Sequence, residues 1–113
     1  SIGNPPNLEA LYLNFNEISD LSPIKMLTSL KTLEIQKNKI KDLYSLSNHP
    51  TLGDLNLMEN KITDLRPLKT LNYIWSVLFW GNPVVQDESH CPVEEGTPDY
   101  LKRICKIFLE IGY

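Results

Sequence analysis

Three aspartates recur at equal spacing and are the first candidates for chemistry: Asp20, Asp42 and Asp64 lie 22 residues apart. If successive 22-residue units stack, their carboxylate oxygens could bind a ladder of Ca²⁺ ions. Alternatively, each aspartate accepts backbone N–H bonds at the start of a turn. Cation ladders usually need glycine-rich loops, and none surrounds these aspartates. The sequence therefore favours the turn interpretation and predicts no metal site.

The two cysteines, Cys91 and Cys105, allow two interpretations. A disulfide between them would close a loop of about 15 residues, contribute ~3 kcal/mol and favour an exported or cell-surface protein. Otherwise they are reduced thiols of a cytoplasmic protein, with Cys105 packed as a small hydrophobe. His90 beside Cys91 is a poor metal signal because no second ligand pair follows at zinc spacing. Cys–His catalysis lacks an orienting motif.

Composition and motifs argue against several classes of function. The 113 residues are 42% hydrophobic and 22% charged, with a formal net charge of −3. This mild acidity argues against nucleic-acid binding, which needs a basic patch. No apolar run approaches the ~20 residues that cross a bilayer. There is no glycine-rich phosphate loop, catalytic carboxylate pair or triad, so the sequence predicts neither an enzyme nor a cofactor.

A 22-residue period organises most of the chain. Apolar positions and one asparagine position repeat without a gap, in the columns Leu8/Leu30/Leu52/Ile74, Leu11/Leu33/Leu55/Val77, Leu13/Ile35/Leu57/Phe79, Asn16/Asn38/Asn60/Asn82 and Ile18/Ile40/Ile62/Val84. Agreement across this many columns indicates a repeat architecture in which each unit buries its apolar face against its neighbours.

The spacing within one repeat predicts how it folds. Leu11 and Leu13 alternate with polar or small residues, as in a short strand with one buried face. After Asn16 the apolar residues come every three positions, which favours 3₁₀ or irregular turns over a long helix. Pro23 and Pro67 suit the first turn of such segments. Stacked units would place their strands in a parallel sheet.

The asparagine column has a physical reason in this geometry. A buried amide has both a donor and an acceptor, so it can satisfy backbone groups of its own coil and of the next. His49 departs from the pattern by replacing a leucine of the column Leu27/His49/Leu71. The sequence predicts a partly exposed turn residue there, with slight loosening of the convex side.

The pattern Leu-x-x-Leu-x-Leu-x-x-Asn-x-Ile-x-x-Leu-x-x-Leu-x-x-Leu resembles the 22-residue class of leucine-rich repeats, as in bacterial internalins and the protein phosphatase 1 regulatory subunit. Residues 20–30 are most similar to the bacterial members. The resemblance covers about residues 2–84. It implies an α/β fold: a right-handed leucine-rich repeat solenoid with a short parallel sheet on the concave face and 3₁₀ or irregular turns on the convex face. It also implies binding of a protein partner.

The repeats are expected over residues 8–84, as 8–29, 30–51, 52–73 and a partial 74–84. Residues 85–113 are expected to form a C-terminal cap, because Gly81-Asn82-Pro83-Val84 and His90-Cys91-Pro92-Val93 resemble caps of bacterial, notably cyanobacterial, members. Thr97 as N-cap and Pro98 at the first position predict a helix over about 98–111. Its apolar stripe would cover the last coil, and consists of Leu101, Ile104, Cys105, Phe108 and Ile111.

Residues 1–7 have two interpretations. Shifted by 22, Ile2 aligns with Ile24, so the segment is either part of a truncated repeat or a minimal N-terminal lid. If the chain is a fragment of a longer solenoid, the open first coil could drive self-association.

Function in this architecture is expected on strand positions that point away from the core. The candidate protein-binding residues combine exposed apolar side chains with polar neighbours, and are Tyr12, Phe15, Glu34, Gln36, Asn56, Met58, Trp75, Leu78 and Trp80. For Leu78 and Trp80 the alternative is that the cap covers them. The pairs Glu9–Lys31 and Lys37–Glu59 are expected to support stacking only. A purely structural segment of a larger protein is the alternative function.

Overall fold

Four short strands form one parallel sheet in the computed structural model, which describes residues 7–83, 98–99 and 101–103. The strands are β1 (Ala10–Tyr12), β2 (Thr32–Glu34), β3 (Asp54–Asn56) and β4 (Ser76–Leu78), in the order β1-β2-β3-β4. Each residue pairs with the one 22 positions along the chain, as in Leu11↔Leu33. The sequence period is therefore the lateral register of the sheet.

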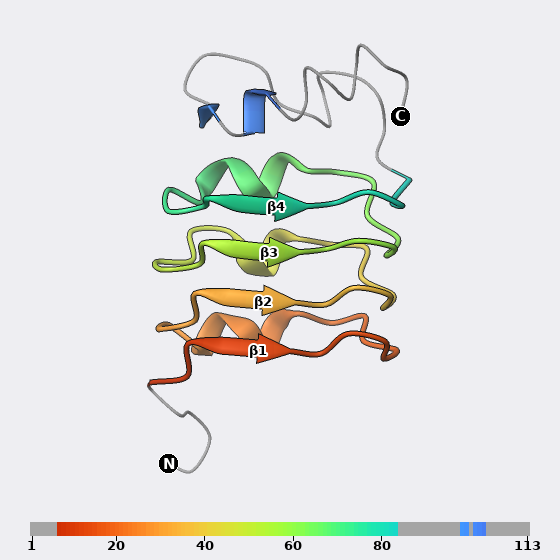
Figure 1. The fold of residues 1–113 in the computed structure, drawn as a ribbon, viewed down its shortest axis with the longest axis horizontal. Helices are drawn as coiled ribbons and strands as arrows, with labels where there is room; N and C mark the ends of the chain where they lie inside the picture. The colour runs from red at the N-terminus through yellow and green to blue at the C-terminus, as the bar shows by residue number, and fades with distance from the viewer. Residues whose placement is uncertain (1–6, 84–97, 100, 104–113) are drawn as a thin grey trace.

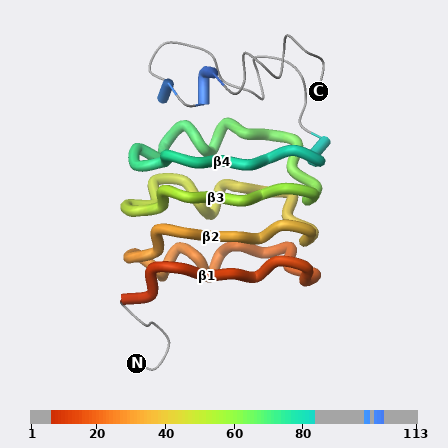
Figure 2. Tube along the Cα trace, in the orientation of Figure 1, coloured from red at the N-terminus to blue at the C-terminus, as the bar shows by residue number. Residues whose placement is uncertain are grey.

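Three 3₁₀ helices form the second layer: η1 (Ser22–Met26), η2 (Tyr44–Leu46) and η3 (Arg66–Thr70). Figure 1 shows them behind the strands, and the tube in Figure 2 shows that the coils which begin with β1, β2 and β3 each pass once through both layers. Helix η2 contacts both η1 and η3. Pro23 and Pro67 are the second residues of η1 and η3, in the first turn, where a missing N–H is tolerated. The predicted solenoid of strands and 3₁₀ turns is confirmed.

The aspartate column starts these turns. The Oδ1 atoms of Asp20, Asp42 and Asp64 accept the N–H of the residue two positions later, at 2.9, 2.8 and 2.9 Å. The backbone N–H and the hydroxyl of Ser22 hold the pKa of Asp20 below its ordinary value of 3.8. These bonds agree with the turn interpretation. Among the described residues there is no group of three side chains suited to hold a metal ion.

The core lies between the two layers. It is built from the inward strand positions and the apolar turn positions, and its fully buried members include Leu30, Leu33, Ile35, Ile40, Leu46, Leu52, Leu55, Leu57, Ile62, Leu65, Leu68 and Phe79. Leu11, Leu13 and Ile18 of the first coil are only partly buried. Each coil thus depends on a neighbour to remove its apolar face from water.

Buried asparagines connect successive coils. Asn60 Nδ2 donates to the carbonyl oxygens of Ile35 and Leu57 at 2.9 and 3.0 Å, and Asn60 Oδ1 accepts the N–H of Ile40 at 3.0 Å. Asn38 and Asn82 make corresponding bonds.

The first asparagine of the column differs from the others. Asn16 is exposed, and within residues 7–83 its amide donates only to the carbonyls of Leu13 and Asn14 in its own coil. The coil-to-coil role thus belongs to the three buried members of the column.

His49 corrects one expectation from the sequence. The side chain is buried, with 6% exposure, rather than partly exposed. Its Nδ1 accepts the N–H groups of Thr51 and Leu52 at 3.3 and 3.2 Å. This arrangement assigns the proton to Nε2, which donates to the carbonyl oxygen of Leu27 at 2.9 Å. His49 therefore links two coils and does not loosen the convex side.

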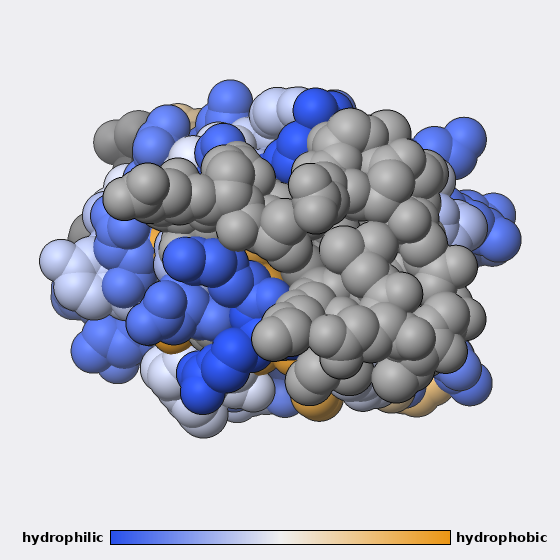
Figure 3. Space-filling view, turned by 90° about the horizontal axis from the view of Figure 1, so that it is seen from above, coloured by the Kyte–Doolittle hydropathy of each residue, from blue (hydrophilic) through white to orange (hydrophobic). Residues whose placement is uncertain are grey.

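At the C-terminal end, Asp99 and residues 101–103 are helical, and the N–H groups of Leu101 and Lys102 donate to the carbonyl oxygen of Pro98, both at 3.0 Å. Leu101 is fully buried in the same core as the coils. The rest of the expected cap, including His90, Cys91 and Cys105, lies outside the described residues. In Figure 3, which looks along the stack from this end, the described surface in view is mainly hydrophilic.

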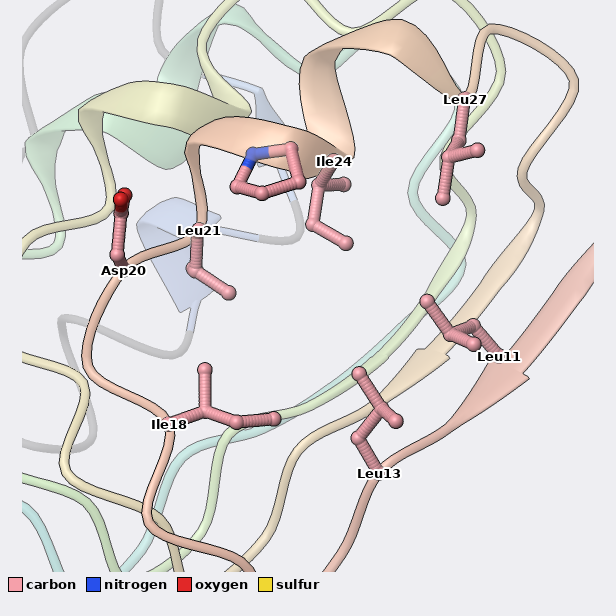
Figure 4. A pocket seen from close by; sticks show the side chains of 8 residues that line it. Leu11, Leu13, Ile18, Asp20, Leu21, Ile24 and Leu27 are labelled. Atoms are coloured by element: carbon pink, nitrogen blue, oxygen red, sulfur yellow. The ribbon is translucent and has the colours of Figure 1, made fainter. Parts of the chain in front are cut away.

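At the opposite end, the first coil borders an apolar cavity of about 300 Å³. Figure 4 draws its lining side chains, which include Leu11, Leu13, Ile18, Leu21 and Ile24. The segment Ile2–Pro6, expected to be a truncated repeat or a lid, lies outside the described residues. In the part of the chain that the structure describes, no helix is long and apolar enough to span a membrane.

Candidate protein-binding face

The outward face of the sheet, which we call the concave face, presents aligned columns of side chains. Backbone bonds extend the alignment past the strand ends: the N–H groups of Leu13, Ile35 and Leu57 donate to carbonyls of the next coil at 2.8, 2.9 and 2.7 Å. The outward columns are Ala10/Thr32/Asp54/Ser76, Tyr12/Glu34/Asn56/Leu78 and Asn14/Gln36/Met58/Trp80. All nine candidate residues lie in or beside these columns.

Exposed apolar side chains occupy both ends of this face. At the β1 end, Tyr12 and Phe15 expose 62% and 66% of their surface. At the β4 end, Trp75, Leu78 and Trp80 expose 74%, 41% and 37%. The last two thus remain exposed, although less than the others. Aromatic side chains of this kind dominate the energetics of protein interfaces.

A polar network separates the two apolar ends. Asn14 Nδ2 donates to Glu34 Oε1 at 3.0 Å, and Asn14 Oδ1 accepts the backbone N–H of Gln36 at 2.8 Å. Asn56 Nδ2 donates to Gln36 Oε1 at 3.3 Å, and Asn56 Oδ1 accepts the N–H of Met58 at 3.1 Å. These half-buried side chains are therefore held in fixed orientations. The sequence columns predict that these side chains are neighbours, but they do not specify which side chain bonds to which.

Charged residues flank the concave columns as matched pairs. Lys31 Nζ lies 3.5 Å from Glu9 Oε1, and Lys37 Nζ lies 3.6 Å from Glu59 Oε2. Lys37 also lies over the Phe15 ring, 5.3 Å from its centroid. Both predicted lateral pairs are present. Because they are well exposed, each is worth at most a few tenths of a kcal/mol.

The column that contains the second pair has an unusual backbone that the sequence analysis missed. Phe15, Lys37 and Glu59 have positive φ values of 62°, 57° and 56°, and Gly81 has 82°. This left-handed conformation turns the chain from the strand toward the asparagine and is rare for side chains other than glycine and asparagine. Gly81 is the one glycine among the four equivalent positions, and it is the sequence feature that indicates this left-handed conformation.

Trp75 lies across Gly53 at the other flank. A Cβ atom placed on Gly53 would be 2.9 Å from both Cδ1 and Nε1 of the indole. The absence of a side chain at Gly53 thus lets the ring lie close to the backbone just before β3 while most of it stays exposed.

Comparisons with known proteins agree with this architecture. A family model described as leucine-rich repeats in two copies matches residues 6–48. The protein named leucine-rich repeat-containing protein 56 is 43% identical over 42 residues in Homo sapiens and in Mus musculus, or 37% of this chain. The crystal structure of an internalin C2 from Listeria monocytogenes superposes with a TM-score of 0.67 at 35% identity over 77% of this chain. A second internalin from that organism gives 0.67 at 31% identity over 71%.

The fold and these matches show that the chain is a leucine-rich repeat protein. This fold is typical of protein-interaction modules. The chain spans 8% of the length of the curated relatives, and 38% and 24% of the two internalin chains.

Proposed function

We propose that the protein binds a protein partner on its concave face and that it acts by recognition rather than catalysis. The observation that carries the proposal is the exposure of aromatic and apolar side chains on and beside the sheet, led by Trp75 and Phe15 at 74% and 66%. Such side chains cost solubility unless a partner covers them. The partner-contacting residues are proposed to be Tyr12, Phe15, Glu34, Gln36, Asn56, Met58, Trp75, Leu78 and Trp80.

The arrangement of this face supports specific rather than general adhesion. The aromatic side chains supply contact area at the two ends, while the network from Asn14 to Asn56 offers oriented polar atoms between them. An interface with apolar anchors and fixed polar groups is typical of selective protein binding.

The test is affinity capture with the wild-type chain and with the double variant Tyr12→Ala, Met58→Ala, followed by identification and purified-protein binding of whatever is captured. We expect the double variant to weaken binding at least about tenfold, since each truncated anchor costs on the order of 1–2 kcal/mol. The matched control is Tyr44→Ala, which removes a tyrosine that is 56% exposed in η2, on the other layer.

The competing function is a structural segment that supports other parts of a larger protein. It predicts that Tyr12→Ala, Met58→Ala and Tyr44→Ala all leave partner binding unchanged. That result would contradict the proposed concave interface.

We also propose that Cys91 and Cys105 form a disulfide within a helical C-terminal cap of the bacterial type. Both cysteines lie outside the described residues, so the proposal rests on the sequence pattern. Reduction of the intact protein should raise its mass by about 2 Da. An unchanged mass would indicate two thiols.

A further inference from the structure

We propose that the partner places an arginine side chain over Tyr12 and Glu34 on the concave face. The inference rests on the proposed function and adds the chemistry of the partner at one position. Tyr12 and Glu34 are lateral neighbours on β1 and β2, in parallel strands about 4.8 Å apart. An aromatic face and a carboxylate at this spacing suit a guanidinium, which can stack on the ring and hydrogen-bond the carboxylate at the same time.

The orientation of Glu34 supports this site. Its Oε1 accepts the amide of Asn14, which belongs to the same coil as Tyr12, so the carboxylate is held toward the β1 side. Asn14 is in turn fixed by the N–H of Gln36. The carboxylate is thus positioned before any partner arrives, and less side-chain freedom is lost on binding.

The charges of the concave face support a cationic occupant. Its three outward columns carry two carboxylates, Glu34 and Asp54, and no cationic side chain. The flanking cations Lys31 and Lys37 already lie beside Glu9 and Glu59. Asp54 is one strand over and two residues back from Glu34, about 8 Å away by strand geometry. Within the described residues its carboxylate accepts no hydrogen bond and forms no ion pair.

The flanking column shows the same three chemical groups in contact, although there the cation occupies a coil of its own between the ring and the carboxylate. In the flanking column, Lys37 lies over the Phe15 ring at 5.3 Å and beside Glu59 at 3.6 Å, so an aromatic ring, a cation and a carboxylate follow one another. In the column of Tyr12 and Glu34 the ring and the carboxylate lie on adjacent coils, with no cation beside them in the column. A partner arginine lying over both side chains would bring the same three groups together.

The experiment uses a phage-displayed library of random peptides selected against the immobilised full chain. Peptides whose binding requires Tyr12 and Met58 are synthesised, and their dissociation constants are measured by fluorescence anisotropy. We expect arginine to be enriched among them. Replacing that arginine by the neutral isostere citrulline should weaken binding about tenfold, as expected for loss of one desolvated charge pair.

The energetic coupling between Glu34 and the arginine of the peptide tests the inference. With Glu34→Gln, which keeps an acceptor for Asn14, the arginine peptide should bind about tenfold more weakly while the citrulline peptide is little affected. Glu17→Gln is the matched control, because Glu17 lies outside the concave columns and its side chain is 84% exposed beside Lys39. It should leave both affinities unchanged.

The outcomes separate this inference from the proposed function. Peptides that require Tyr12 and Met58 but lack arginine, or whose arginine is insensitive to Glu34→Gln, would overturn the arginine site and leave the concave interface standing. If no selected peptide depends on Tyr12 or Met58, the proposed function fails and the arginine site fails with it.

Discussion

Individual buried polar side chains determine whether one coil fits the next. Asn60 joins three backbone groups that lie on two coils, namely those of Ile35, Leu57 and Ile40. An apolar side chain of similar size would fill the space but leave the buried N–H of Ile40 without a partner. The carbonyls of Ile35 and Leu57 would each lose one of two amide donors, since Asn38 and Asn82 also donate to them. Unpaired buried polar groups are costly, so the asparagine has a structural role that size alone does not explain.

Asn60→Leu should therefore lower the free energy of unfolding by about 1–3 kcal/mol, the cost of leaving the buried Ile40 N–H unpaired. The matched control is Asn16→Leu in the same column, which removes an exposed side chain whose bonds to described residues lie within its own coil. Urea denaturation of the two variants measures the difference. Equal losses would show that the bonds between coils are not what makes the position important.

Asp20 predicts a pH effect. Its pKa is lowered by the Ser22 N–H and hydroxyl, so its contribution to stability is present above the unfolded value near 3.8 and is lost as the pH falls through the folded-state value. Asp20→Asn keeps an acceptor but no titrating group. The variant should lose less stability than wild type between about pH 6 and about pH 2, measured by thermal denaturation. Parallel pH profiles would contradict this.

The contacts of individual side chains are harder to predict from the sequence than the elements or the overall architecture. The asparagine bonds follow from the column and from the need to pair buried backbone. His49 does not follow, because substitution of a leucine in an apolar column suggests exposure. It is buried since its two ring nitrogens bond groups of Leu27, Thr51 and Leu52. Which side-chain atoms meet depends on coil spacing, which only the three-dimensional structure gives.

At the scale of the elements, the short-range spacing of apolar residues was enough to predict the secondary structure of each repeat. The alternation around Leu11 predicted a strand and the spacing of three after Asn16 predicted 3₁₀ turns, and both are present. The left-handed column was missed because three of its four residues are not glycine. Their conformation follows from the turn that stacking requires, and the tertiary structure overrides the preference of Phe15, Lys37 and Glu59.

The approach of Trp75 to Gly53 predicts a coupling between neighbouring strands. Gly53→Ala should destabilise the protein by about 1 kcal/mol, because the new Cβ would displace the indole. In a Trp75→Ala background the same change should cost clearly less. A double-mutant cycle of urea denaturation measures the coupling. An equal cost in both backgrounds would assign the strain to the carbonyl of Tyr73 instead, 3.1 Å from the added atom.

The whole molecule is a stack in which each coil is stabilised by its neighbours, so the ends matter as much as the middle. Leu101 lies fully buried in the coil core although it comes long after the last strand. Its packing means that the C-terminal residues which the structure describes share the stability of the repeats.

Leu101→Ala should lower the free energy of unfolding by about 2–5 kcal/mol, as expected for a buried leucine. The loss should appear in the far-UV circular dichroism of the entire solenoid, because the leucine shares one core with the coils. Arg103→Ala, which removes an exposed side chain, is the control and should have little effect. A loss confined to a minor part of the signal would mean that this end unfolds independently.

The candidate site was predictable to the level of columns and no further. Register alone brings Tyr12 beside Glu34 and Asn56 beside Leu78, because it fixes which residues are lateral neighbours. Exposure and orientation were not predictable: the position of Trp75 depends on Gly53, and the direction of Glu34 depends on Asn14.

The constant register of 22 residues also affects how such a protein can change over time. A tandem duplication of residues 30–51 would insert a whole coil whose Asn38 and Asp42 meet equivalents of their usual neighbours. The recognition surface would then lengthen by one row of outward side chains, while the older rows keep their places. Insertion of a few residues within a strand would instead shift the alternation and turn core side chains outward. Duplication therefore gives this architecture a way to acquire new specificity without rebuilding its core.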